Sequence, residues 1–174
     1  MDWCKYAKDC VGDKVYNKYM RNKTITLKEK LLKELENYFG NDSKRINHAR
    51  KVMDYAERLL QQEGGDWQIV IPASILHDVG IKVAEEKYGS PLNYYQDKEG
   101  TEVARKILLQ VGLRKEDIEE ICEIIAHHHS AGRINTLNFK ILYDADCLVN
   151  LKENLKNKDK QSTPALIDKV FLTQ

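Results

Sequence analysis

Apolar residues recur at a helical period along most of the chain. Between the glycines at 40 and 64, for example, the apolar positions fall on one face of a helix: Ala49, Val52, Met53, Ala56, Leu59 and Leu60. Only QIVIP, at residues 68–72, resembles a strand, and it continues into ASILHDVG, which again fits a helix. The pattern therefore predicts an all-α fold, a bundle of helices around one apolar core.

Glycine, proline and polar clusters separate the predicted helices. Residues 1–21 hold aromatics without a strong period and are expected to form an N-terminal extension, and residues 85–98 are expected to form a loop with a short helix. Gly80 is expected to cap the helix before it. No repeat or linker divides the chain, so residues 1–174 predict a single domain, with helices at 26–39, 42–63, 66–79, 98–111, 115–129 and 136–155.

Composition limits the classes of partner. The chain has 174 residues, and its formal net charge of +1 gives no electrostatic reason to expect a nucleic acid polymer or a membrane as the main partner. No apolar run is long enough to span a bilayer, and the segment after Met1 does not resemble a signal peptide, so we expect a cytoplasmic protein. The sequence does not indicate an oligomeric state.

All five histidines fall in three short segments. His48 lies in RINHARKV, His77 precedes Asp78 in ILHDVG, and residues 127–129 form the run HHH; an aspartate pair, at 144 and 146, follows in YDADCL. A single histidine on an apolar face is more often a hydrogen-bonded core residue than a ligand. The combination of these histidines with aspartates in apolar helices instead predicts a divalent metal held by imidazole and carboxylate groups.

Helical phase indicates which of these side chains point inward. Asp146 lies closer than Asp144 to the apolar face of its helix, and Asp144 is expected to face away from it, so Asp146 is the better candidate ligand. The buried face of the preceding helix, continued at about 100° per residue, reaches His128 and His129 and leaves His127 nearly opposite. The inward direction of His128 and His129 requires the helix to stay regular through the histidine run.

These segments resemble the HD-domain superfamily of metal-dependent phosphohydrolases. The family pattern is a histidine, then a His-Asp pair, then an aspartate, on separate helices of an all-α bundle, and here it matches His48, His77-Asp78 and Asp146. The segments RINHARKV, ILHDVG and YDADCL are similar to the family's motifs, and the HHH run is similar to the HH of some subfamilies. The resemblance covers about residues 43–150.

The resemblance implies one divalent metal ion, with Mn, Ni, Co, Fe, Zn and Mg all compatible, held by His48, His77, Asp78 and Asp146. It implies a small-molecule phosphorylated substrate, a phosphomonoester or nucleotide-type compound, attacked by a metal-activated water. Two-metal members carry a further histidine four residues before a glycine. That place here is Gln96, so a single ion is expected.

The remaining roles follow from the same resemblance and from side-chain chemistry. Asp78 is expected to orient the water, and His128 and His129 to offer a proton or a hydrogen bond to the phosphate. Arg45, whose planar fork suits a phosphate, is expected to bind substrate together with His127 and Lys82, although Lys82 also fits a solvated loop residue. Two alternatives stay open: an HD-fold non-haem iron oxygenase, and a metal-stabilised binding or regulatory domain without turnover.

Overall fold

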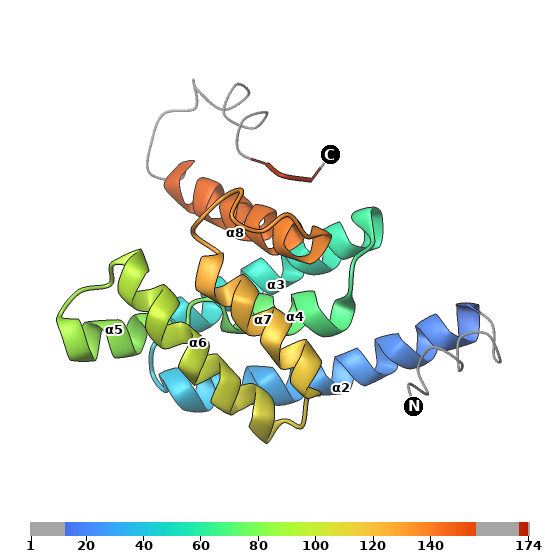
Figure 1. The fold of residues 1–174 in the computed structure, drawn as a ribbon, viewed down its shortest axis with the longest axis horizontal. Coiled ribbons are helices and arrows are strands. Elements are labelled where there is room, and N and C mark those ends of the chain that lie inside the picture. Colours follow the sequence, from blue (N-terminus) through green and yellow to red (C-terminus); the bar gives the residue numbers. More distant parts are fainter. Residues whose placement is uncertain (1–12, 156–170, 174) are drawn as a thin grey trace.

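The computed structural model describes the backbone of residues 13–155 and 171–173, and the side chains of residues 26–153 and 171–173. Within these ranges the chain forms helices and no strands, as the sequence predicts (Figure 1). The helices are α2 (Asp13–Phe39), α3 (Ser43–Glu63), α4 (Trp67–Leu76), α5 (Gly80–Tyr88), α6 (Asn93–Gln110), α7 (Lys115–His127) and α8 (Leu137–Leu155).

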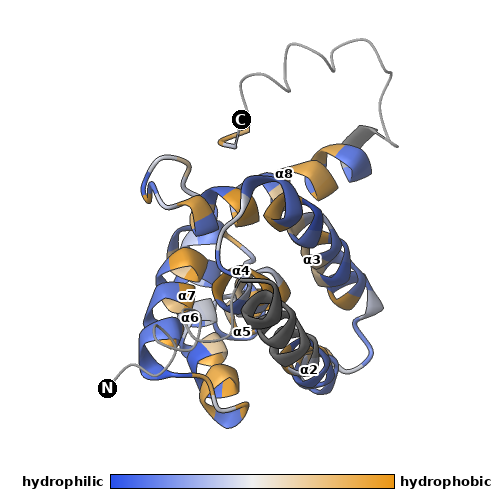
Figure 2. Cartoon of the chain, turned by 90° about the vertical axis from the view of Figure 1, so that its right-hand side faces the viewer, coloured by the Kyte–Doolittle hydropathy of each residue, from blue (hydrophilic) through white to orange (hydrophobic). Residues whose placement is uncertain are grey.

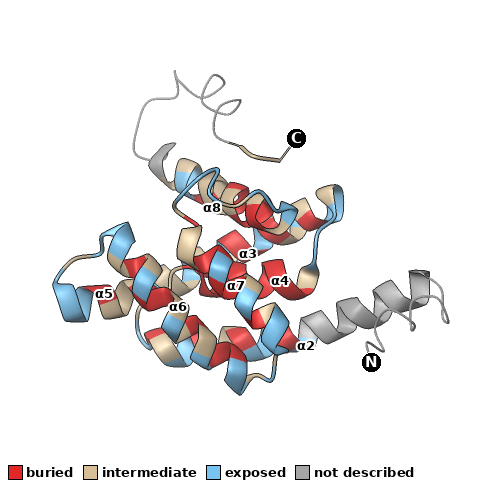
Figure 3. Cartoon of the chain, in the orientation of Figure 1, coloured by how far each residue is buried: buried red, intermediate tan, exposed pale blue. Residues whose placement is uncertain are grey.

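Helix α4 is the centre of the bundle. All its residues from Gln68 to Leu76 are buried, and it contacts α2, α3, α7 and α8 (Figure 3). A helix that is apolar on every side is stable only where neighbours cover all of its faces, which explains this central position. His77 and Asp78 follow α4 directly, so their polar side chains emerge inside the protein, where they need partners.

Helices α3 and α8 pack against each other and against α4. Asp42 accepts a hydrogen bond from the backbone N–H of Arg45 and so caps α3, and Gly64, at φ 85°, ends the helix. The buried residues of α3 are five of the six predicted from its period: Ala49, Val52, Met53, Ala56 and Leu60. No described helix is both long enough and apolar enough to cross a bilayer (Figure 2).

Three predicted boundaries are wrong. Helix α2 begins at Asp13, so part of the expected N-terminal extension is helical; residues 1–12 lie outside the described residues. Gly80 begins α5 instead of capping α4, and most of the expected loop at 85–98 belongs to α5 and α6. A Cβ atom on Gly80 would lie 2.1 Å from the carbonyl oxygen of Gln96, so Gly80 lets two backbones touch, which periodicity does not reveal.

Asp144 has a different position from the one that helical phase predicts. Instead of facing away from the core it is buried, and its carboxylate accepts hydrogen bonds from Leu172 N at 2.7 Å and from Thr173 N and Oγ1. The segment at 171–173 covers this part of α8, and a contact so distant in sequence is not visible in the local pattern.

Candidate metal centre

His77 is the most enclosed residue of the candidate site. It lies at the end of α4 with helical backbone angles, and its side chain is 1% exposed. Its Nδ1 lies 2.9 Å from the carbonyl oxygen of Ser74, one turn earlier. A carbonyl oxygen can only accept a hydrogen bond, so Nδ1 carries the proton in the neutral ring, and Nε2 keeps a lone pair that can bind a metal.

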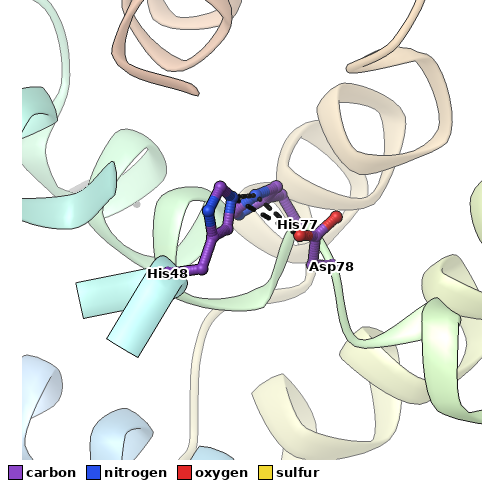
Figure 4. A group of neighbouring side chains, drawn as sticks. All are labelled: His48, His77 and Asp78. Atoms are coloured by element: carbon purple, nitrogen blue, oxygen red, sulfur yellow. Dashed lines mark hydrogen bonds and ion pairs between the residues drawn. The ribbon is translucent and has the colours of Figure 1, made fainter. Parts of the chain in front are cut away.

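Side chains from α3, from the α4–α5 turn and from α8 converge on this nitrogen. His48 Nε2 lies 3.4 Å from His77 Nε2 and 3.1 Å from Asp146 Oδ1. His77 Nε2 lies 3.4 Å from Asp78 Oδ2 and 3.6 Å from Asp146 Oδ1. Figure 4 shows His48, His77 and Asp78 turned toward one another. Together with the distances to Asp146, this brings three segments of the sequence to one point.

These spacings fit a metal ligand set. Ligand atoms about 2.1 Å from an octahedral ion stand roughly 3.0 Å apart along each edge, close to the separations observed here. One potential ligand atom each from His48, His77 and Asp78 lie within 4.8 Å of one another. Two imidazoles and two carboxylates suit a divalent first-row metal, so the residues present fit the ion that the sequence predicts.

Two further residues, Asn150 and Glu153, contact the predicted ligands and were not identified from the sequence. Asn150 donates a hydrogen bond to Asp146 Oδ2 at 3.0 Å, which leaves Oδ1 directed at the histidines. Glu153 Oε2 lies 4.0 Å from His48 Nδ1, the nitrogen that does not face the cluster, and Glu153 also pairs with Lys51. Their positions one and two turns after Asp146 on α8 are the signal that could have found them.

The charged groups of the cluster strongly shift one another's pKa values. Burial lowers the pKa of His77, but Asp78 and Asp146 more than offset this, so the pKa lies well above its ordinary value of 6.5. Burial raises the pKa of both carboxyls, but His77 and His128 hold the pKa of Asp78 well below its usual range, and His48 and His77 lower that of Asp146. A divalent cation would replace the proton that pairs His77 with these carboxylates.

His128 faces the same cluster from α7. It is buried, as helical phase predicts, because its backbone keeps helical angles beyond the last residue of α7. Its Nδ1 lies 2.7 Å from the carbonyl oxygen of Ile125. Its Nε2 is buried, has no hydrogen-bond partner among the described residues, and lies 3.6 Å from Asp78 Oδ1. Asp78, His128 and His129 form a second group that could hold an ion, so the number of ions stays a prediction.

His129 meets a carboxylate that the sequence did not single out. Its Nδ1 lies 2.8 Å from Asp97 Oδ1, on α6. Asp97 follows Gln96, the residue at the place of the additional family histidine, and that proximity is the signal that could have found it. Gln96 itself is buried, and its side-chain amide donates to the carbonyl oxygen of Pro91.

Two of the predicted substrate-binding residues, Arg45 and Lys82, bond to other groups of the protein. The guanidinium of Arg45 is paired with Asp42 at 2.7 Å and with Glu85 at 2.6 Å. Lys82 donates to the carbonyl oxygen of Tyr38 at 2.8 Å. Both side chains therefore already donate to other groups of the protein, although each has further N–H donors. Their roles, and that of the partly exposed His127 at the end of α7, stay predictions.

Comparisons with known proteins agree with this arrangement. The model of the HD domain family matches residues 45–151, a range that contains all the histidines and Asp146. The crystal structure of a predicted HD superfamily hydrolase from an uncultured Thermotogales bacterium is similar, with a TM-score of 0.57 and 22% identity over 82% of this chain and 83% of that chain. No curated protein matches the chain.

Proposed function

Because the chain belongs to the HD-domain family, we propose that it is a metal-dependent phosphohydrolase acting on a phosphomonoester or a nucleotide-type substrate. The observation that carries this proposal is the convergence of His48, His77, Asp78 and Asp146 from three separate parts of the bundle. Such a set leaves ligand positions open for water and a phosphate oxygen on a six-coordinate ion.

A divalent ion held by these four residues would supply the electrophilic part of the chemistry, since it would polarise a phosphate oxygen and lower the pKa of a bound water. The protein residues do the rest. Asp78 presents Oδ2 to His77 and Oδ1 to His128, so one carboxylate links the ligand set to the histidine run. From that position it can orient the attacking water.

His128 and His129 lie on the other side of Asp78 and are proposed to handle the proton. The buried Nε2 of His128 has no hydrogen-bond partner in the part of the chain that the structure describes, and it can donate to, or accept from, a group that enters the site. His129 is more accessible, with 22% of its side chain exposed, and can transfer a proton to the leaving oxygen of the substrate.

One observation favours a second candidate function, an HD-fold iron oxygenase. Asp78, His128 and His129 could hold a second ion beside one held by His48, His77 and Asp78, and a paired-iron oxygenase requires two ions. The hydrolase is preferred because Gln96, at the place of the additional family ligand, bonds to Pro91 instead of reaching the cluster.

The test begins with the protein as purified. Its metal would be identified and counted per chain, and a panel of phosphomonoesters and nucleotides would be assayed with Mn²⁺, Co²⁺, Ni²⁺, Mg²⁺ and Fe²⁺. Phosphate release that needs the metal and disappears in His77→Ala supports the proposal. Iron-dependent oxygen consumption with two ions per chain supports the oxygenase. Stoichiometric metal with neither activity would leave the binding-domain alternative.

A further inference from the structure

We propose that Asp97 is a positioning residue for His129, which it holds in the tautomer with the proton on Nδ1. The role of His129 in proton transfer rests on the proposed function, but the tautomer does not. The consequence is that Nε2 keeps the lone pair with which His129 can take up or deliver a proton.

The packing of α6 on the start of α5 places Asp97 beside the candidate metal centre. Gly80 and Gly100 bring the two backbones together, and a Cβ atom on Gly80 would lie 2.7 Å from Gly100 N. Asp97 lies one turn before Gly100 on α6, while Gly80 lies two residues after Asp78. The same close contact therefore sets the position of the Asp97 carboxylate relative to the His-Asp turn.

Asp97 has one clear partner in the histidine run. Its Oδ1 lies 2.8 Å from His129 Nδ1 and 3.8 Å from His128 Nδ1. His128 Nδ1 already lies 2.7 Å from the carbonyl oxygen of Ile125, so it donates its proton to that oxygen. A carboxylate only accepts hydrogen bonds, which means that Nδ1 of His129 must donate.

His77, His128 and His129 differ in the group that accepts a hydrogen bond from Nδ1. The Nδ1 atoms of His77 and His128 face backbone carbonyls, of Ser74 and Ile125, and their side chains are each 1% exposed. In His129 the group within hydrogen-bond distance of Nδ1 is a carboxylate, that of Asp97, and His129 is the most exposed of the three at 22%. A carboxylate that accepts from Nδ1 fixes the tautomer and the orientation of the imidazole ring.

The experiment uses the full chain, labelled with ¹⁵N at histidine and loaded with Zn²⁺, a diamagnetic ion. Two-bond ¹H–¹⁵N correlation spectra report the tautomer of each ring, and His129→Gln identifies the signals of His129. The variants are Asp97→Ala, which removes the acceptor, and Asp97→Asn, which keeps a side-chain carbonyl. Glu102→Gln, an exposed carboxylate on the same helix, is the matched control.

His129 is expected as a single Nδ1–H tautomer in the wild-type protein and in Glu102→Gln, and as a mixture of tautomers in Asp97→Ala. On a substrate that is turned over, kcat of Asp97→Ala should fall about 10- to 100-fold with KM and bound metal unchanged, while Asp97→Asn should keep more of the activity. Circular dichroism and thermal unfolding identify a variant that fails to fold, and Asp97→Asn then carries the test.

Two results would overturn the proposal: an Nε2–H tautomer of His129 in the wild-type protein, or an unchanged tautomer in Asp97→Ala. Loss of metal from folded Asp97→Ala would also overturn it, because Asp97 would then be a ligand. If no substrate is turned over but the tautomer changes as expected, the positioning of His129 is supported and the hydrolase proposal fails.

Discussion

Asp78 and Asp144 are both largely enclosed aspartates, but they have different kinds of partner. Asp78 lies among histidines, at 3.4 Å from His77 and 3.6 Å from His128, whereas Asp144 accepts hydrogen bonds from Leu172 and Thr173. The first arrangement suits a cation, and the second holds a segment of backbone. Substitution of each residue separates the two roles.

Asp78→Ala is expected to lose both bound metal and turnover, because it removes a ligand that no neighbour replaces. Asp144→Ala should keep metal and most activity but lose about 1–3 kcal/mol of unfolding free energy, since the partly buried donors of Leu172 and Thr173 lose their acceptor. Metal per chain by mass spectrometry and urea denaturation measure the two effects. Equal loss of metal in both variants would show that Asp144 also serves the ion.

The histidine run is expected to show a graded response. His128→Ala and His129→Ala should each lower turnover by roughly 10²–10⁴-fold with metal retained, because each removes a group proposed to handle a proton. His127→Ala should do much less, because adjacent residues on a helix point about 100° apart and His128 is the buried one. Steady-state kinetics of the three variants provide the test, and the greatest loss in His127→Ala would contradict it.

Metal affinity is expected to depend on pH through His77. Below its raised pKa, Nε2 carries a proton that the metal must displace, so affinity should rise about tenfold per pH unit as pH increases toward that pKa. Asp78 and Asp146, with lowered pKa values, stay ionised there and add no dependence. Calorimetry in buffers of different ionisation enthalpy counts the released protons; an affinity independent of pH would refute the assignment of His77.

The metal-free protein should show the opposite trend in stability. The folded-state pKa of His77 lies above its ordinary value of 6.5, so its pairing with the carboxylates stabilises the fold fully below that value. This contribution is lost as pH rises through the folded-state pKa.

At the scale of the elements, the contact between α5 and α6 depends on two glycines with different amounts of space. A Cβ atom on Gly80 would meet backbone atoms at 2.1 Å and 2.7 Å, distances that no side-chain movement can relieve. A Cβ atom on Gly100 would lie 3.3 Å from Gly80 N and 3.5 Å from Ile125 Cγ2, which is tight but not prohibitive.

Gly80→Ala is therefore expected to destabilise the fold by at least about 1–3 kcal/mol and to disturb the adjacent His-Asp turn. Gly100→Ala should change stability by less than about 1 kcal/mol, because the crowding is offset by the better helix propensity of alanine. Denaturant unfolding of the two variants compares them directly. A larger loss in Gly100→Ala would mean that the helices approach each other differently.

At the scale of the whole molecule, a bound ion would join α3, the α4–α5 turn and α8, which are distant in sequence. Because the ligand set exists only in the folded chain, metal is expected to stabilise it, by about 2.7 kcal/mol when free metal is a hundred times the dissociation constant. Thermal unfolding with metal and with a chelator measures this difference. The shift should vanish in His77→Ala and persist in His127→Ala; its persistence in both would place the ion elsewhere.

The sequence alone determined the features that depend on local periodicity. The helical class, the apolar face of α3 and the burial of His128 all follow from side chains repeating at the helical period. The set of His48, His77-Asp78 and Asp146 was recognised in another way, from the resemblance of their short segments to the motifs of the HD-domain family.

Only the tertiary structure decided which distant groups meet. Asp97 reaches His129 because Gly80 and Gly100 bring α5 and α6 into contact. Arg45 pairs with Glu85, and Asp144 holds Leu172 and Thr173, through contacts 28 to 40 residues apart in sequence. Helical phase specifies the direction of a side chain but not the neighbour that lies there, because that neighbour depends on how the helices pack.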